Sequence, residues 1–315
     1  MKTLIIDGNN SVWRLSKKMP ILTTADTKQE IQVVYGFLRL LRSVLVQFSP
    51  DLALICWDLG KSEYRKKIFP EYKANRHHDS TSAEAREFRS VLSQMEILKD
   101  LLRNLAVAQL TYPEMEADDL IGISCAELAG DKTIVSSDQD MLHLVDNKVS
   151  VWSPIKTELY TMNNFHQKLF LSPRQWLEYR AVCGDNGDNI PGIAKGLGPT
   201  TAMEIIQKYG SVEVLFRDSK VAERVASKGN RYALFVAEGA REQFYRNLLL
   251  MDLHLSIRQE KAEKVVLLLR KNIKGLKPIN KVALQEYFIK KEFVSLLKDM
   301  PNWLNPFQDL NVHDS

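Results

Sequence analysis

The sequence predicts an α/β fold, in which helices flank a mostly parallel central sheet and a helical C-terminal lobe follows. Up to about residue 160, short apolar runs typical of buried strands alternate with segments whose apolar residues recur at helical spacing. From about residue 210 to residue 300 the pattern is helical and indicates no strand. At 315 residues, the chain is long enough for two domains.

The N-terminal elements follow from the spacing of apolar residues. Residues 2–6 form an apolar run that ends in a turn at residues 7–10, so we expect a buried strand followed by a helix. Apolar residues then recur every three or four positions from Ile31 to Phe48, the spacing of a helix that packs one face on a sheet. Further strands are predicted at residues 52–57, 107–110, 133–136, 148–152 and 157–160.

The later elements are helical. Two helices are predicted at residues 173–183 and 199–209, the second with Pro199 at its first position, and a glycine-rich acidic stretch separates them. We therefore expect a core domain over residues 1–183 and a helical lobe over residues 184–305. Residues 306–315 are expected to form a loose tail.

Composition excludes several classes of protein. With 45% hydrophobic and 26% charged residues, the chain is an ordered globular protein. Three widely spaced cysteines support neither a disulfide framework nor a structural zinc site, which favours a reducing cytoplasm. The longest aliphatic run, at residues 265–269, is far shorter than the ~18 residues that span a bilayer, so we expect no membrane association.

Acids follow four of the predicted strands at the point where each strand ends. Because the carboxyl ends of parallel strands meet at one edge of a sheet, these carboxylates are expected to converge on one site. Such a group needs cations to neutralise it, and oxygen ligands without His or Cys suit Mg²⁺ or Mn²⁺. These acids are Asp7, Asp58, the group of Glu116, Asp118 and Asp119, and the pair of Asp138 and Asp140.

Two more acids, Asp185 and Asp188, join this set if their loop folds back toward the same site. Each acid alone is better explained as a turn residue or a helix N-cap, and only their joint placement favours metal ligands. The chain holds 43 Lys and Arg against 39 Asp and Glu, so setting these acids aside leaves a strongly basic remainder. A polyanionic substrate fits that balance.

Basic side chains gather between Lys61 and His78, with Tyr64, Phe69 and Tyr72 interleaved. A solvated helix face would explain the charges alone, but aromatic rings among bases also provide stacking surfaces for unpaired nucleotides. The candidate nucleic-acid contacts here are Arg65, Lys66, Lys67 and Tyr72.

Residues 190–209 have the form of a helix-hairpin-helix, which aims glycine N–H groups at a DNA phosphate with little regard to base sequence. The segment is not a nucleotide-binding P-loop, because its GxxxxGK[ST] pattern does not occur in the chain. The candidate DNA contacts in the hairpin are Gly192, Lys195, Gly196, Gly198 and Thr200.

Taken together, these motifs resemble the 5′-nuclease family. This family comprises flap endonucleases, the 5′-nuclease domain of bacterial DNA polymerase I, and phage-encoded ribonuclease H and 5′-exonuclease enzymes. The likeness runs in family order from residue 5 to about residue 206. The matching segments are residues 5–9, 57–58, 69–76, 116–119, 136–140 and 184–192, with the hairpin after them. Residues 152–154 and 247–252 are most similar to the phage ribonuclease H branch.

The resemblance implies a PIN-like 5′-nuclease core with a helical arch at about residues 70–105 and a duplex-binding lobe. It implies two Mg²⁺ ions, the first held by Asp7, Asp58, Glu116 and Asp118. The second ion would be held by Asp138, Asp140, Asp185 and Asp188, with Asp119 close to both. Lys73 and Arg76 resemble the family's catalytic basic pair, and the hairpin resembles one that also holds a monovalent cation such as K⁺.

The activity implied is 5′-3′ exonuclease and flap endonuclease cleavage of DNA/DNA and RNA/DNA duplexes, with ribonuclease H activity, removing RNA primers or flaps in DNA replication. A single-stranded-DNA-binding protein and a sliding clamp are the partners implied, and we expect a monomer. Two alternatives stay open. One is a PIN-type ribonuclease or metal-dependent phosphatase, which would not need the hairpin, and the other is a DNA-junction-binding protein without catalysis.

Overall fold

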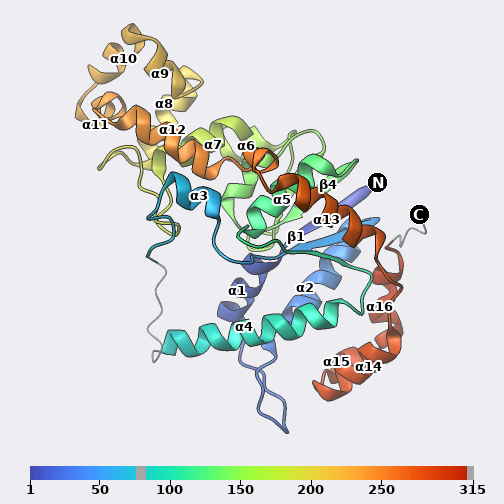
Figure 1. Cartoon of the computed structure of the whole chain (residues 1–315). Coiled ribbons are helices and arrows are strands. Elements are labelled where there is room, and N and C mark those ends of the chain that lie inside the picture. Colours follow the sequence, from blue (N-terminus) through green and yellow to red (C-terminus); the bar gives the residue numbers. More distant parts are fainter. Residues whose placement is uncertain (76–82, 311–315) are drawn as a thin grey trace.

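The computed structural model describes residues 1–75 and 83–310, and its centre is one six-stranded sheet in the order β3-β2-β1-β4-β5-β6 (Figure 1). The first five strands are parallel and β6 is antiparallel to β5, so the predicted mostly parallel sheet is confirmed. The strands are β1 (Lys2–Asp7), β2 (Leu52–Cys56), β3 (Ala108–Leu110), β4 (Asp131–Val135), β5 (Val149–Ser153) and β6 (Glu158–Tyr160).

The register of the parallel strands aligns their carboxyl ends. Ile6 lies opposite both Ile55 of β2 and Val135 of β4, and Asp7 lies opposite Cys56. The residues that follow β1, β2 and β4 therefore leave the sheet at the same edge, where ligand sites of open parallel sheets are found.

Alternation along β1 places its side chains in two separate cores, one on each face of the sheet. Leu4 and Ile6 pack with α1 (Gly8–Lys18), α2 (Gln32–Phe48) and α4 (Ala83–Leu102), whereas Ile5 packs on the other face with α5 (Ala117–Glu127). The predicted apolar stripe from Ile31 to Phe48 forms α2, and α2 is buried through Phe37 and Leu41 among others.

The predicted arch at about residues 70–105 is described only in part. It begins after α3 (Glu63–Ile68), and its residues 76–82 lie outside the described part. Helix α4 packs on α2 through Val91, Met95 and Leu98, and its N-terminal part approaches α1 through the ion pair of Glu87 with Lys17.

Helices beyond the sheet form a lobe that projects from the core (Figure 1). Helices α7 (Pro173–Cys183) and α8 (Pro199–Tyr209) match the predicted bounds, and α12 (Ala240–Met251) packs on α7. Smaller helices complete this part of the chain: η1 (Gln139–Leu144), α6 (Phe165–Leu169), α9 (Glu213–Arg217), α10 (Ser219–Ala226), α11 (Asn230–Ala233), η2 (Leu234–Val236) and η3 (Leu253–Arg258).

The C-terminal helices differ from the expectation of one lobe over residues 184–305. Helix α13 (Ala262–Lys274) packs on α5 and β3, and α16 (Met300–Gln308) returns to α2, together with α14 (Lys281–Lys290) and α15 (Val294–Lys298). The loose tail is wrong for residues 306–310, because Phe307 and Leu310 are buried in the α2 core. Burial of these apolar side chains away from water stabilises the packed conformation relative to an exposed tail.

Two negative findings agree with the composition. None of the helices described is long and apolar enough to cross a bilayer. Cys56, Cys125 and Cys183 are all free thiols.

Candidate active site and metal centre

The acidic edge of the sheet surrounds a cavity of about 690 Å³. Five of the predicted metal ligands line it, together with Lys73. We call it the acidic cavity, and these five ligands are Asp7, Asp58, Glu116, Asp118 and Asp138.

The end of β1 and the end of β2 position the first two carboxylates. Asp7 caps α1, because its Oδ1 accepts the Asn10 N–H at 3.0 Å, and its Oδ2 accepts the Ser136 hydroxyl at 2.8 Å. Asp58 accepts the Ala117 N–H at 2.6 Å, and its own N–H donates to Asn9 Oδ1 at 2.9 Å. These bonds tie the acids to the first turns of two helices and fix their orientation toward the cavity.

The start of α5 supplies the next two ligands. Glu116 is the N-cap of this helix, and Asp118 lies in its first turn, where the helix dipole favours negative charge. Glu116 is buried, and burial alone would raise its pKa, but the Lys73 ammonium and the Arg65 guanidinium outweigh burial and lower it. Glu116 is therefore a carboxylate that already has its counter-ions.

The other acids of the cavity lack such compensation. Burial raises the pKa of Asp7 to about 6, and Asp58 adds to the effect. Burial raises the pKa of Asp138 to about 7, with Asp140 and Asp7 adding to it. Burial also raises the pKa of Asp118 well above its usual value, with contributions from Asp138 and Asp7. Like charges this close bind protons or cations, so the donor set fits hard divalent ions with oxygen ligands.

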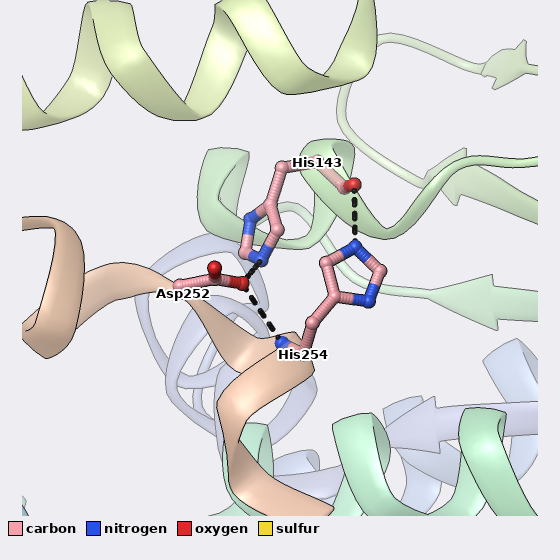
Figure 2. A group of neighbouring side chains, drawn as sticks. All are labelled: His143, Asp252 and His254. Atoms are coloured by element: carbon pink, nitrogen blue, oxygen red, sulfur yellow. Dashed lines mark hydrogen bonds and ion pairs between the residues drawn. The ribbon is translucent and has the colours of Figure 1, made fainter. Parts of the chain in front are cut away.

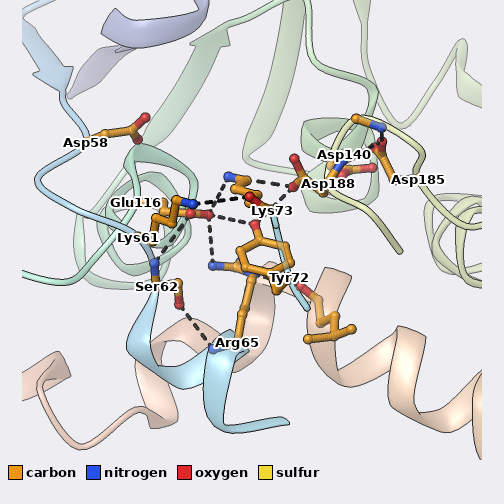
Figure 3. Close-up of polar contacts among 12 residues, drawn as sticks. Asp58, Lys61, Ser62, Arg65, Tyr72, Lys73, Glu116, Asp140, Asp185 and Asp188 are labelled. Atoms are coloured by element: carbon orange, nitrogen blue, oxygen red, sulfur yellow. Dashed lines mark hydrogen bonds and ion pairs between the residues drawn. The ribbon is translucent and has the colours of Figure 1, made fainter. Parts of the chain in front are cut away.

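Lys73 connects the acidic cavity to the loop after α7 (Figure 3). Its Nζ lies 2.8 Å from Glu116 Oε2 and 3.6 Å from Asp188 Oδ2, and its backbone N–H donates to the Asp188 carbonyl at 2.9 Å. The Tyr72 hydroxyl lies between the same two carboxylates, 2.8 Å from Glu116 Oε2 and 2.9 Å from Asp188 Oδ2, and donates its hydrogen bond to them. Asp188 is thus brought beside the cavity, as expected from a loop that folds back. Arg76, the predicted partner of Lys73, lies outside the described residues.

Asp140 and Asp185 are close to each other but do not line the cavity, because Arg180 of α7 binds both. Its Nε lies 2.7 Å from Asp140 Oδ1 and its Nη2 lies 2.6 Å from Asp185 Oδ2. The guanidinium therefore neutralises two of the four acids predicted for a second ion.

Asp119 differs from the prediction of a metal ligand. It is fully buried, and its oxygens accept from Arg65 Nη1 at 2.7 Å, Ser256 Oγ at 2.9 Å and Gln259 Nε2 at 3.0 Å. A carboxylate with this set of donors holds η3 and α3 on α5 and does not face the cavity.

Two predicted nucleic-acid contacts are also corrected. Arg65 is buried, and besides Asp119 it binds the Leu250 carbonyl through Nε at 2.8 Å. Tyr72 is 2% exposed, so it has no free face on which a base could stack. Both side chains point inward because buried carboxylates on α5 attract them. Lys66 and Lys67 are exposed, as a nucleic-acid contact requires.

The helix-hairpin-helix has the expected form, with α7 and α8 joined by residues 184–198. Gly184 has a φ of 74°, and a Cβ there would lie 2.4 Å from the Ile190 carbonyl oxygen, so only glycine allows this loop to close. Lys195, Gly196 and Thr200 are exposed, and Gly192 and Gly198 are half-buried. Asn247 of α12 supports the loop from behind, since its Nδ2 donates to the Pro191 and Ala181 carbonyls at 2.8 Å each.

Sequence reasoning missed Arg14 and Trp13. Both line the acidic cavity from α1, and Trp13 stacks on Phe88 of α4 with ring centroids 5.2 Å apart. Buried Nε and Nη2 atoms of Arg14 have no hydrogen-bond partner within residues 1–75 and 83–310, and burial lowers the pKa of its guanidinium. A buried guanidinium with two donors that no described residue uses suits an oxyanion such as phosphate. The only signal in the sequence was the position of Arg14 two helical turns after Asp7.

A second group of metal-ligand types, His143, Asp252 and His254, lies outside the acidic cavity (Figure 2). Burial lowers the pKa of His143 to about 4, so its ring is neutral, and its Nε2 accepts the Leu253 N–H at 2.9 Å. That bond uses the lone pair that a metal would need. His143 therefore joins η1 to η3 and is not an open ligand.

The comparisons with known proteins agree with this geometry. Residues 2–170 match the family model of the 5′-3′ exonuclease N-terminal resolvase-like domain, and residues 171–266 match that of the 5′-3′ exonuclease C-terminal SAM fold. A 5′-3′ exonuclease of Aquifex aeolicus is 33% identical over 228 residues, covering 71% of this chain and 75% of the relative. A DNA polymerase I of Caldicellulosiruptor bescii is 27% identical over 95% of this chain, which spans only 33% of that relative's length.

Solved structures share the fold. A T5 5′-exonuclease with bound zinc ions superposes with a TM-score of 0.70 at 21% identity, covering 86% of this chain and 99% of that chain. The catalytic core of Rad2 in complex with DNA substrate gives a TM-score of 0.54 at 14% identity, covering 97% of this chain and 91% of that chain. The two matched domains, the acidic edge of the sheet and the helix-hairpin-helix lead to one conclusion: the chain is a nuclease that belongs to the 5′-3′ exonuclease family.

Proposed function

We propose that this nuclease hydrolyses phosphodiester bonds near free 5′ ends and 5′ flaps of duplexes, using two divalent ions held at the acidic cavity. The observation that carries the proposal is the convergence of five carboxylates and Lys73 on one cavity. Mg²⁺, for which Mn²⁺ can substitute, suits these oxygen ligands. Ions bound there would lower the pKa of a water molecule and stabilise the charge on the leaving oxygen.

The proposed ligands form two groups, one for each ion. Asp7, Asp58, Glu116 and Asp118 already face the cavity and would hold the first ion. The second ion would be held by Asp138 with Asp140, Asp185 and Asp188. Asp140 and Asp185 are paired with Arg180, so binding the second ion requires that this arginine share or release them.

Lys73 is proposed as the residue that contacts the reacting phosphate. Its ammonium lines the cavity and is held by Glu116, so its position is set before a substrate arrives. A fixed cation at this point would neutralise the charge that develops on the phosphate oxygens. Arg76 is proposed as its partner on the strength of the family resemblance.

The substrate would be held at two places. Lys195 and the glycine N–H groups of the hairpin, with a K⁺ ion between its carbonyls and the DNA, would bind a duplex phosphate, and Arg14 would bind a phosphate of the unpaired 5′ strand. Selectivity would then depend on a free 5′ end and a junction and not on base sequence. Two solved structures of the same fold contain DNA, a T5 flap endonuclease in a pseudo-enzyme-product complex and the Rad2 catalytic core with DNA substrate, which supports a DNA ligand.

The biological setting is proposed from the same resemblance. The nuclease would remove RNA primers or flaps during DNA replication, acting as a monomer on RNA/DNA and DNA/DNA duplexes with ribonuclease H activity. A single-stranded-DNA-binding protein and a sliding clamp are the proposed partners. The free cysteines fit a reducing cytoplasm.

The test is cleavage of labelled duplexes that carry a single-stranded flap on either the 5′ or the 3′ side, with DNA or RNA in the flapped strand. Products from the 5′ substrate alone, in Mg²⁺ and not in EDTA, are expected. Cleavage of the 3′ flap at an equal rate would refute the polarity. Binding of the 5′ flap without any cleavage would favour the non-catalytic junction-binding alternative.

A further inference from the structure

A group of cations and aromatic rings lies on the helical lobe, away from the acidic cavity. Lys208 and Lys228 place their ammonium groups 5.7 and 5.4 Å from the centroid of the same ring, that of Tyr209. Lys228 also lies 5.4 Å from the centroid of Tyr232, and the guanidinium of Arg231 lies 4.7 Å from it. We call these five residues the lysine–tyrosine strip.

The strip has more positive charge than its surroundings neutralise. In the part of the chain that the structure describes, neither Lys208 nor Lys228 forms an ion pair, and only Arg231 approaches an acid, Glu204, at 3.5 Å. The buried hydroxyl of Tyr209 has no hydrogen-bond partner there either. An anion that binds beside the Tyr209 ring would be within reach of both ammonium groups.

The strip is continuous with the hairpin. A methyl group at Gly196 would lie 3.9 Å from Leu234 Cδ1, so η2 lies next to the hairpin, and η2 directly follows the helix that carries Arg231 and Tyr232. The Tyr232 hydroxyl donates to Glu204 Oε2 at 2.6 Å, which holds α11 against α8, the second helix of the hairpin. The strip therefore extends the hairpin surface along α8 to its C-terminal end. Figure 1 shows α8 and α11 together in the projecting lobe.

We propose that the lysine–tyrosine strip binds backbone phosphates of the same duplex that the hairpin holds, farther from the acidic cavity; this rests on the proposed function. Helix α8 has 11 residues and is about 16 Å long, which corresponds to about five base pairs of duplex. Cations already cover the faces of Tyr209 and Tyr232, so the strip suits phosphates and not stacked, unpaired bases. The rings hold the long side chains in place and lower the entropy lost on binding.

The test compares K208Q/K228Q with K281Q/K290Q, a control pair of exposed lysines on α14. Affinity for flap DNA with a duplex arm of roughly 8 or roughly 20 base pairs is measured by fluorescence anisotropy in Ca²⁺ between about 50 and 200 mM KCl. Each phosphate contact contributes about 0.9 to the slope of log affinity against log salt. We expect K208Q/K228Q to lose about 1.8 from that slope on the long arm, with about tenfold weaker binding, and to match wild type on the short arm.

Three results would overturn the inference. The first is a salt slope of K208Q/K228Q on the long arm that equals the wild-type slope. The second is a loss of affinity in K208Q/K228Q that is equal on the long and the short arm. The third is an acidic peptide that binds the strip of wild type and is not displaced by DNA. Wild-type cleavage of the 5′ flap in Mg²⁺ is measured in parallel. If wild type cleaves and the slope is unchanged, only the strip is refuted, whereas a wild type that neither binds nor cleaves refutes the proposed function as well. Thermal melting of both double variants confirms that they are folded.

Discussion

Replacing Asp138 by Asn should stabilise the metal-free protein and weaken the protein's response to metal. The substitution removes a negative charge from the acidic cavity but keeps the helix cap, because an Asn Oδ1 can accept the Asp140 N–H that Asp138 accepts at 2.8 Å. The variant therefore tests the effect of the negative charge alone, without loss of the helix cap.

The magnitude follows from the pKa of Asp138, which rises from 3.8 to about 7 on folding because of burial and the neighbouring Asp140 and Asp7. A raised carboxyl pKa means that the native state binds the proton more tightly than the unfolded state. Its contribution to stability is complete below about pH 4 and is lost as the pH rises through about 7. Three pKa units correspond to an upper limit of about 4 kcal/mol.

In EDTA at pH 8 we expect Asp138→Asn to be more stable than wild type by about 1–3 kcal/mol, because ions and water in the open cavity screen part of the repulsion. This corresponds to a rise in Tm of about 2–5 °C for a chain of this size. At pH 5 the difference should fall to less than half of its value at pH 8, since it vanishes only below about pH 4. In about 10 mM Mg²⁺ wild type should gain more stability than the variant. Differential scanning calorimetry at the two pH values, with and without Mg²⁺, measures all three effects. A variant less stable than wild type in EDTA at pH 8, or a difference independent of pH, would refute the reasoning.

The remaining predictions concern cleavage and binding. Asp118→Asn should abolish cleavage of a 5′ flap while DNA affinity in Ca²⁺ stays within about twofold; comparable turnover at saturating Mg²⁺ would contradict its place as a ligand. Lys73→Ala should lower the single-turnover rate by about 10²-fold or more, well beyond any loss of affinity, and equal losses in both would indicate a binding role instead. Arg14→Gln should weaken binding of the flap strand about tenfold and leave the affinity of the blunt duplex unchanged, whereas an equal effect on both would place Arg14 on the duplex. Lys195→Ala should lower the salt slope of duplex binding by about 0.9 for every sequence tested, and an unchanged slope would mean that Lys195 faces away from phosphate.

Sequence patterns predicted the sheet well because short apolar runs and the acids at strand ends are local properties. The alternation of Leu4, Ile5 and Ile6 between two cores needs only the strand itself. Likewise, parallel register alone brings Asp7 beside the residues that follow β2 and β4.

The errors concern properties that depend on distant partners. Asp118 and Asp119 are adjacent on α5, and the turn of about 100° between them directs one to the cavity and the other to Arg65. In the same way Tyr72 is buried by acids far along the chain, at Glu116 and Asp188. The basic and aromatic residues between Lys61 and His78 predict an exposed surface. Arg65 and Tyr72 are buried because they bind carboxylates that only the tertiary fold brings next to them.

The central claim is that the carboxylates around the acidic cavity form a divalent-metal centre on which cleavage depends. The most direct measurement counts Mn²⁺ ions bound by wild type and by Asp7→Asn/Asp118→Asn, using electron paramagnetic resonance, and follows 5′-flap cleavage over the same Mn²⁺ range. The account predicts two bound ions in wild type, cleavage that rises as they bind, and the loss of at least one ion and of cleavage in the double variant. Equal Mn²⁺ binding by both proteins, or wild-type cleavage that persists in EDTA, would contradict it.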